Sequence, residues 1–299
     1  KVFGVHQTFS FPTVYFAQKK VLKTAYEKEK ASFELQKSKL KSNIEKVYNQ
    51  IVFYQHQEKL YHFLDSLHQN FAKASSRRFE LGESNYLEKI TAQAKYKQIT
   101  TQLKQIASDK KTAYAQLQAL LQTDSLITVQ NTELQPYQLS DSTSQGLYQN
   151  YFATVSANMK QQNSFQKQNW FPDLSIEYFQ GKNSGLSQSL YGIQVGVAIP
   201  LFFNGNVTKQ KVARLEMESW EQQKESETET INRYIEQKQS ELLKYQEAID
   251  YYNETGKHLA SEIIKVADMS YKHGEIDFFQ YIQSLENATT IQVDYCRRL

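Results

Sequence analysis

The chain has 299 residues, a nearly balanced net charge of +3 and only 10 glycines and 4 prolines, so its elements should be long and uninterrupted. The balanced charge, with acidic and basic residues interleaved, excludes strong attraction for nucleic acid. The lack of any run of 18 apolar residues excludes a membrane-spanning helix, and a single cysteine, Cys296, excludes an intrachain disulfide.

Residues 3–11 alternate in the manner of a β-strand. One face carries Phe3, Val5, Phe9 and Phe11, with Gln7 as the exception, and the other face carries Gly4, His6, Thr8 and Ser10. No secretory signal is visible, so we expect the sequence to begin at a mature or truncated start.

Two long helices are predicted next, over 16–70 and 75–122. Heptad-like positions in the second recur at alternating steps of three and four: Tyr96, Ile99, Leu103, Ile106, Lys110, Ala113, Leu117 and Leu120. The first would be about 80 Å long at 1.5 Å per residue, a length typical of coiled coils or helical tubes.

Three histidines, a residue type that binds metals, lie on the first of these helices. His56, His62 and His68 are six residues apart, so their side chains point about 120° away from each other. They cannot share a metal, and we expect them on the solvated surface of the helix.

The sequence predicts a change from long helices to other structure in the middle of the chain. The polar stretch 123–146 should form a small, irregular, packed connection, followed by a helix at 147–168. Strands are predicted at 169–181, with Leu174, Ile176 and Tyr178 on one face, and at 190–202. Two further long helices are expected over 206–255 and 258–299.

The two halves of the sequence are related by an internal repeat. Gly4 and Pro12 match Gly192 and Pro200 at an offset of 188, Tyr54-Gln55 matches Tyr245-Gln246 at an offset of 191, and Gly82-Glu83 matches Gly274-Glu275 at an offset of 192. Ordered matches over about 100 residues indicate a duplication. We therefore divide the chain into a first repeat (1–122), an equatorial connection (123–146) and a second repeat (147–299).

The strand at 190–202 has the pattern of a transmembrane β-strand, which needs about 9–11 residues that alternate outward apolar with inward small or polar side chains. Its bulky face carries Tyr191, Ile193, Val195, Val197 and Ile199, with Phe202-Phe203 at its far end. Trp170 and Phe171 would begin the preceding strand at interface depth. Periodicity equally allows a small soluble sheet that caps a helical bundle. Three strands cannot close a barrel, so the membrane interpretation requires several chains.

Several stretches together resemble the TolC family of outer-membrane efflux proteins, nearest to its heavy-metal and drug efflux branch (CusC- or CzcC-like). These are "GIQVGVAIPLFFNG", the lead-in "QNWFPDLSIEYF", and the glycine-centred "RRFELGESNYLEKITAQ" and "YKHGEIDFFQYIQSLE". The resemblance spans essentially the whole chain. It implies a mainly helical protein with membrane β-strands: a homotrimer whose protomers each give four strands to a shared 12-stranded outer-membrane barrel and long antiparallel helical hairpins to a periplasmic α-barrel.

The resemblance also implies partners and a location. The channel would sit in outer-membrane lipid with most of the chain in the periplasm, and would act with a periplasmic adaptor (membrane fusion) protein and an inner-membrane RND-type pump. It would be a passive duct for heavy-metal cations or small toxic compounds. The family has two further helices and one strand before the position of Lys1 and a tail beyond Leu299, so we expect the sequence to be a portion of a protomer or to come from an unusual parent.

Two helical turns, at 75–89 and 269–283, are the predicted functional positions. Glycine at each turn permits a tight chain reversal. By resemblance the turns are periplasmic tips that meet the adaptor, with contacts at Arg77, Arg78, Gly82, Glu83, Gly274 and Glu275. Three residues expected one or two turns further into the helices are candidates to ring the closed aperture: Glu88, Asp277 and Gln280.

No motif for catalysis is present in the sequence. It has no HExxH, no Cys/His cluster, no phosphate-cradling glycine loop and no nucleophile elbow, so we expect no enzyme activity, no metal site and no cofactor. The alternative from another class is a soluble coiled-coil scaffold or a periplasmic adaptor, in which the strands would form a small domain of their own.

Overall fold

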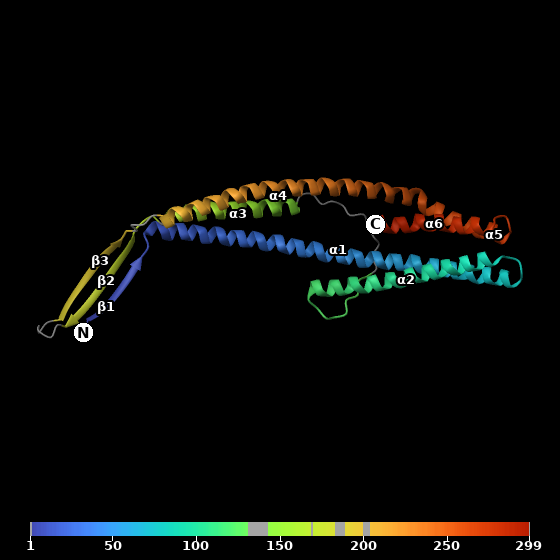
Figure 1. Cartoon of the computed structure of the whole chain (residues 1–299), viewed down its shortest axis with the longest axis horizontal. Helices are drawn as coiled ribbons and strands as arrows, with labels where there is room; N and C mark the ends of the chain where they lie inside the picture. The colour runs from blue at the N-terminus through green and yellow to red at the C-terminus, as the bar shows by residue number, and fades with distance from the viewer. Residues whose placement is uncertain (1, 131–142, 169, 183–188, 200–203, 299) are drawn as a thin grey trace. The chain divides into compact units, whose positions relative to one another are not determined.

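The computed structural model describes residues 2–130, 143–168, 170–182, 189–199 and 204–298. The chain forms two compact units, Lys1–Ser38 with Ser140–Arg233 (the first unit) and Lys39–Leu139 with Tyr234–Leu299 (the second unit). Two long helices, α1 (Pro12–Glu80) and α4 (Asn204–Tyr251), contribute to both units (Figure 1). The units combine parts of both predicted sequence repeats, whose boundaries stay a prediction.

The first unit contains an antiparallel sheet of three strands in the order β1-β2-β3. These are β1 (Val2–Phe9), β2 (Asp173–Lys182) and β3 (Ser189–Ala198), so the three predicted strands are confirmed. Their ends differ from the prediction. β1 ends two residues early because Pro12, whose fixed φ suits the first turn of a helix, begins α1. Residues 200–203, which include Pro200 and Phe202-Phe203, lie outside the described residues.

Trp170 and Phe171 were predicted to begin the second strand, and this prediction was wrong. Both precede β2, which begins at Asp173 after Pro172. The Phe171 ring instead stacks on Phe11, with centroids 5.0 Å apart. Proline lacks the backbone N–H that a strand ladder uses, which explains why pairing begins only after it.

The helical part of the first unit is held by polar contacts from α3 (Thr143–Gln168). Asn158, 2% exposed, donates to the Val21 carbonyl (3.2 Å) and to Thr24 Oγ1 (3.0 Å) of α1. On α4, Trp220 Nε1 donates to Ser156 Oγ at 3.0 Å. These bonds satisfy buried polar groups and fix the register of α3 against α1 and α4.

The second unit joins two helical hairpins around one apolar cluster. The first hairpin is the C-terminal part of α1 with α2 (Tyr86–Leu121), and the second is α5 (Lys257–Lys272) with α6 (Phe278–Arg298) (Figure 1). Their shared cluster consists of Phe71, Ala72, Ala92, Ala267, Phe278, Tyr281, Ile282 and Leu285. Residue Val129 of the predicted connection is also buried, against Ile51 and Leu117, while residues 131–142 lie outside the described residues.

The predicted ends of the long helices were wrong although the turns themselves were placed well. The predicted break near residues 70–75 does not exist, because α1 continues to Glu80. The predicted helix 258–299 is interrupted at 273–277 and becomes α5 and α6. Each chain reversal occurs at a glycine with a positive φ angle, which is +75° at Gly82 and +76° at Gly274. The residues just before each glycine cannot adopt that conformation at low cost.

A π-helical segment, Tyr252–Gly256, joins α4 to α5. A π turn holds one more residue than the α-helical turn it replaces. The sequence offset between the repeats rises from 191 at Gln246 to 192 at Gly274, so the second repeat has one extra residue between these positions. The π segment lies in that interval and accommodates the insertion without breaking the helix.

Replacing Gly82 or Gly274 with alanine tests the turn geometry. A side chain in the left-handed conformation costs about 1–2 kcal/mol, although a Cβ at either position meets nothing within 4 Å. We therefore expect each variant to lower the free energy of unfolding by about that amount in urea titrations. Gly205→Ala, in open space within α4, is the matched control and should be neutral or slightly stabilising. A loss as large for Gly205→Ala would contradict the assignment.

Candidate functional site: the paired helical turns and the exposed sheet

The two turns of the second unit have the same hydrogen-bond pattern. Glu83 N–H donates to the Arg78 carbonyl (2.9 Å) and Gly82 N–H to the Phe79 carbonyl (3.0 Å); in the second turn Glu275 and Gly274 donate in the same way to Ser270 (2.9 Å) and Tyr271 (3.2 Å). This is the Schellman arrangement that ends a helix at a glycine. The repeated sequence thus produces a repeated backbone at both turns.

The helix that follows each turn begins with a capping box. Asn85 Oδ1 accepts from the Glu88 N–H at 2.9 Å, and Asn85 Nδ2 donates to the Glu88 carboxylate at 3.2 Å. At the second turn Asp277 Oδ1 accepts from the Gln280 N–H at 2.8 Å, and Gln280 Oε1 accepts from the Asp277 N–H at 3.1 Å. The second turn thus has two backbone N–H groups satisfied reciprocally, whereas at the first turn only the Glu88 N–H is a backbone donor and the return bond joins the two side chains.

The capping boxes correct the predicted positions of the aperture candidates. Asp277 precedes α6, and Glu88 and Gln280 lie in the first turn of their helices, so none is one or two turns further in. The neutral Gln280 matches Glu88 because an amide and a carboxylate can both accept the bond that a capping box needs. A role at an aperture stays a prediction for all three.

The six predicted tip residues lie on the two turns, and the structure brings several of them together. Arg78 Nη1 donates to the Tyr271 hydroxyl at 2.7 Å, and its guanidinium carbon lies 5.3 Å from the centre of the Tyr271 ring. Arg78 Nε also lies 3.8 Å from the Glu83 carboxylate, while Glu275 accepts a bond from Ser270 Oγ at 2.9 Å. Arg77 is exposed. The bond from Arg78 to Tyr271 therefore links the first hairpin to the second beside both turns.

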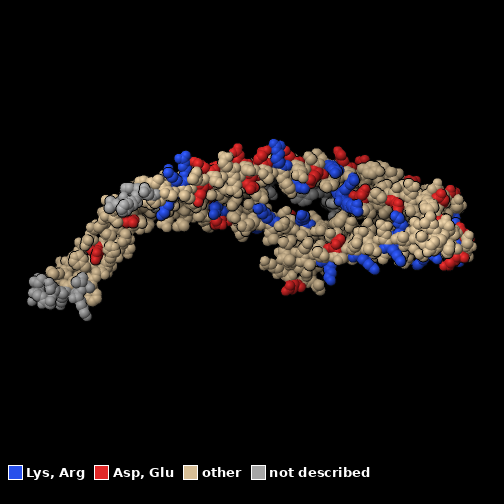
Figure 2. Space-filling model, viewed as in Figure 1, with Lys and Arg blue, Asp and Glu red and all other residues tan. Residues whose placement is uncertain are grey.

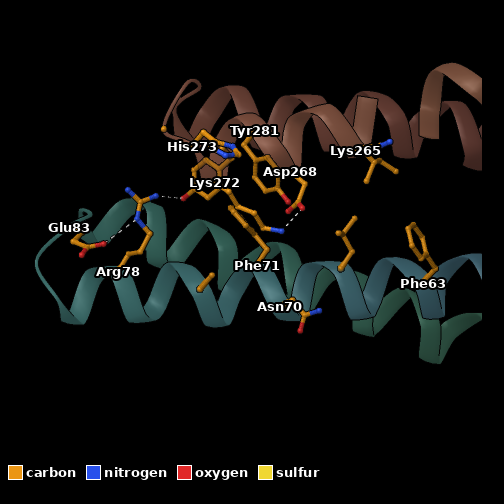
Figure 3. A pocket seen from close by; sticks show the side chains of 15 residues that line it. Phe63, Asn70, Phe71, Arg78, Glu83, Lys265, Asp268, Lys272, His273 and Tyr281 are labelled. Atoms are coloured by element: carbon orange, nitrogen blue, oxygen red, sulfur yellow. Dashed lines mark hydrogen bonds and ion pairs between the residues drawn. The ribbon is translucent and has the colours of Figure 1, made fainter. Parts of the chain in front are cut away.

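A cavity of about 890 Å³ opens between α1 and α5 behind this link. Figure 3 shows Arg78 and Glu83 at the turn end of the cavity, with the Phe71 ring on its floor and Tyr281 and Asp268 on the opposite helices. Lys272 Nζ lies 2.6 Å from Asp268, so the rim is charged and largely internally paired. An aromatic floor with a charged rim is suited to an amphipathic protein segment or ligand.

Sequence reasoning missed the aromatic cluster beneath the turns. The Phe71 ring lies 4.8 Å from Tyr281, 5.4 Å from Phe278 and 5.9 Å from Tyr271. Burial, with smaller contributions from Asp268 and Tyr271, raises the pKa of Tyr281 to about 12. Burial also raises the pKa of Tyr271, against the opposing effect of Arg78. Both phenols therefore stay neutral at physiological pH, and the Tyr271 hydroxyl accepts the bond from Arg78.

The sheet of the first unit presents a broad apolar face to its surroundings. The pairing places Val5, Tyr178 and Ile193 side by side, and Gln7, Ile176 and Val195 in the next row. The predicted outward residues of β3 are all exposed: Tyr191 76%, Ile193 72%, Val195 69%, Val197 56%, and Ile199, just past the strand, 64%. A contiguous apolar face this exposed indicates a partner surface that lies outside the single chain.

The opposite face of the sheet carries mostly small or polar residues, with Phe179 and Leu190 as the large apolar exceptions. His6, Glu177 and Gln194 form one row across the three strands, and His6 Nδ1 lies 3.7 Å from the Glu177 carboxylate. The Phe179 ring lies over Gly192, where a Cβ would come within 2.5 Å of it, so glycine is needed for this close approach. Figure 2 shows few charged side chains on the visible part of the strands and many on the helices.

The histidine prediction was partly wrong. His62 is exposed as expected, but His68 is only 4% exposed. No group of His, Cys, Asp or Glu side chains that could hold a metal occurs among the described residues. Over the same part of the chain, no helix is both long and apolar enough to span a bilayer.

Comparison with known proteins finds similarity in structure. No protein-family model and no curated protein sequence matches the chain. The outer membrane protein VceC of Vibrio cholerae superposes with a TM-score of 0.82 over 99% of this chain and 75% of its own, at 13% identity. The CmeC outer membrane channel of Campylobacter jejuni superposes with a TM-score of 0.76 over 100% of this chain and 74% of its own, at 15% identity. CusC superposes with a TM-score of 0.79 over 99% of this chain and 73% of its own, at 15% identity.

These similarities extend over both units and essentially the full chain, including the strands and the paired turns. The resemblance expected from the sequence is therefore confirmed at the level of the fold: the chain has the fold of the outer-membrane efflux channels. The identities of 13–15% are too low to carry partners or cargo with them.

Proposed function

We propose that the protein is the outer-membrane channel component of a tripartite efflux system. The observation that carries the proposal is the sheet, whose apolar face is exposed along all three strands while its opposite face is mostly small or polar, apart from Phe179 and Leu190. A β-sheet in lipid requires this division of its faces and must close into a barrel to satisfy its edges. The shared fold with outer-membrane channels supports the same assignment.

In the proposed assembly three copies close one barrel. Each protomer contributes four strands to a total of 12, as the resemblance implies, and Tyr191, Ile193, Val195, Val197 and Ile199 contact lipid. The long helices continue the duct through the periplasm. The duct is passive and performs no chemistry: an RND-type inner-membrane pump supplies the energy, and the cargo is a heavy-metal cation or a small toxic compound.

The paired turns are the proposed contact for the periplasmic adaptor. They combine exposed charges, such as Arg77, with the aromatic-floored cavity that Arg78, Glu83 and Gly274 help to line. The Arg78–Tyr271 contact joins the two hairpins, and we propose that it holds the periplasmic end in its closed arrangement. An adaptor that binds better when this contact is broken would open the duct, because a ligand shifts an equilibrium toward the state it prefers.

Planar-bilayer recording of the full-length protein tests the function and this contact together. We expect wild-type protein to form discrete ion-conducting channels. Arg78→Ala removes a partly exposed charged hydrogen bond and a cation–π contact worth together about 1 kcal/mol, so the open fraction should rise about fivefold. Arg77→Ala, one residue away and exposed, is the control and should behave as wild type.

The outcomes of this recording separate the two claims. Membrane-inserted protein that never conducts would reject the duct. Conducting channels with the same open fraction in wild type, Arg78→Ala and Arg77→Ala would reject the closing role of Arg78 and leave the duct in place.

A further inference from the structure

A buried histidine interrupts the apolar stripe of α1 in the second unit. His68 is 4% exposed and lies between Leu64 (0% exposed) and Phe71 (5% exposed) along the stripe. Among the residues that the structure describes, its Nδ1 atom has no hydrogen-bond partner. Ser75, 1% exposed, follows seven residues later on the same face, and its hydroxyl also has no partner. Buried polar groups without partners are rare and call for an explanation.

Helix packing alone does not require these two polar residues. At the offset of 192 that relates the two turns, His68 matches Ala260 and Ser75 matches Ala267. The two alanines are buried on α5, at 0% and 5% exposure. The same positions of the duplicated hairpin thus pack well with a small apolar side chain, and the histidine is a specific property of the first hairpin.

Charged groups from three helices act on His68. Lys95 of α2 forms an ion pair with Glu286 of α6, and Asp65 of α1 accepts a hydrogen bond from Thr100 Oγ1 at 2.6 Å. Lys95, Glu286 and Asp65 are the charged groups that act on the imidazole. The Lys95–Glu286 pair connects α2 of the first hairpin to α6 of the second, and both side chains act electrostatically on His68 of α1, so we call this meeting of the three helices the junction.

Protonation of His68 is unfavourable while this junction is closed. Burial lowers the pKa of His68 below its ordinary value of 6.5, and Lys95 lowers it further, against the opposing effects of Glu286 and Asp65. The imidazole is therefore neutral in the closed junction and regains its ordinary pKa when the junction opens to water. The closed junction keeps its full stability above pH 6.5 and loses stability as the pH falls from 6.5 toward the lowered pKa.

We infer that His68 is a proton-sensitive switch that loosens α6 from α1 and α2 when the pH falls below neutral. A proton on the imidazole places a charge in an apolar stripe next to Lys95, and the charge is relieved when water enters the junction. The role of this switch in channel opening rests on the proposed function. Acid would favour release of the α5–α6 hairpin beside the turns and would therefore favour the open duct. The effect of protonation on the junction does not depend on that function.

Hydrogen–deuterium exchange of the full-length protein at pH 7.5 and 5.5 tests the switch. After correction for the intrinsic effect of pH on exchange, protection of α6 amides in the wild type should fall about threefold or more at pH 5.5. His68→Leu and His68→Gln cannot take up the proton, so both should keep their protection. His62→Gln, which removes an exposed histidine from the same helix, should respond as wild type.

Equal loss of protection in wild type and both His68 variants would overturn the switch, as would wild-type protection that does not change. Bilayer recording of the same proteins then tests the regulatory meaning: acid should raise the open fraction of wild-type channels but not of the His68 variants. An exchange response without this change in open fraction would overturn the regulation. An absence of conductance at any pH would reject the duct, and the exchange result would still decide the role of His68.

Discussion

Phe71→Ala is expected to lower the free energy of unfolding of the protein by about 3–5 kcal/mol. Phe71 is 5% exposed, and its ring contacts Tyr271, Phe278 and Tyr281 of the second hairpin. Its removal leaves a cavity between the hairpins, because four helices in contact cannot all move to fill it. Loss of this packing should also weaken the link between the two turns.

Urea unfolding monitored by circular dichroism measures this effect. Phe63→Ala is the matched control, since Phe63 lies on the same helix but is 50% exposed. The control should lose about 1 kcal/mol or less. Comparable losses for the two variants would mean that the aromatic cluster is not the joint between the hairpins.

Val195→Arg is expected to prevent stable insertion of the sheet into membranes. Val195 lies near the middle of β3 on the exposed apolar face, opposite Ile176 of β2. An arginine that faces lipid near the midplane of a β-barrel costs about 2–4 kcal/mol. Three copies in one barrel would each bear this cost, so the membrane-inserted fraction should fall strongly.

The neighbouring residue supplies a control on the opposite face. Gln194 lies in the row with Glu177 and His6, so Gln194→Arg would project away from lipid and next to a carboxylate. Folding into lipid vesicles, followed by protease protection, should show insertion of Gln194→Arg and failure of Val195→Arg. Equal insertion of both variants would show that the two faces of the sheet are not lipid and lumen.

The elements with strict periodicity were predictable from the sequence. Alternation in residues 3–11 and 190–202 fixes the face of each side chain, and the sheet register places the bulky residues of all three strands together as expected. The turns were predictable because Gly82 and Gly274 occur at matched positions of the repeats. The spacing Asn85-x-x-Glu88 and Asp277-x-x-Gln280 is present in the sequence, but the helix starts were not predicted from it.

Features that depend on packing between distant segments were not predictable in this way. The spacing of Leu64, His68 and Phe71 places His68 on one apolar stripe of α1, but the sequence does not say which partners cover that stripe and bury it. The π segment has no periodic signal of its own, and the insertion could be recognised only as a change of offset between repeats. Arg78 and Tyr271 are 193 residues apart, so their contact follows from the meeting of the two hairpins and not from either turn.

The mass of the protein in detergent tests the central claim most directly. Full-length protein extracted from membranes would be measured by light scattering, with the detergent contribution subtracted. A shared barrel predicts three protomers per particle and dependence on detergent, because the apolar face of β3 is exposed in the described part of the chain. A monomer or dimer that stays in solution without detergent would contradict the channel and favour a soluble scaffold.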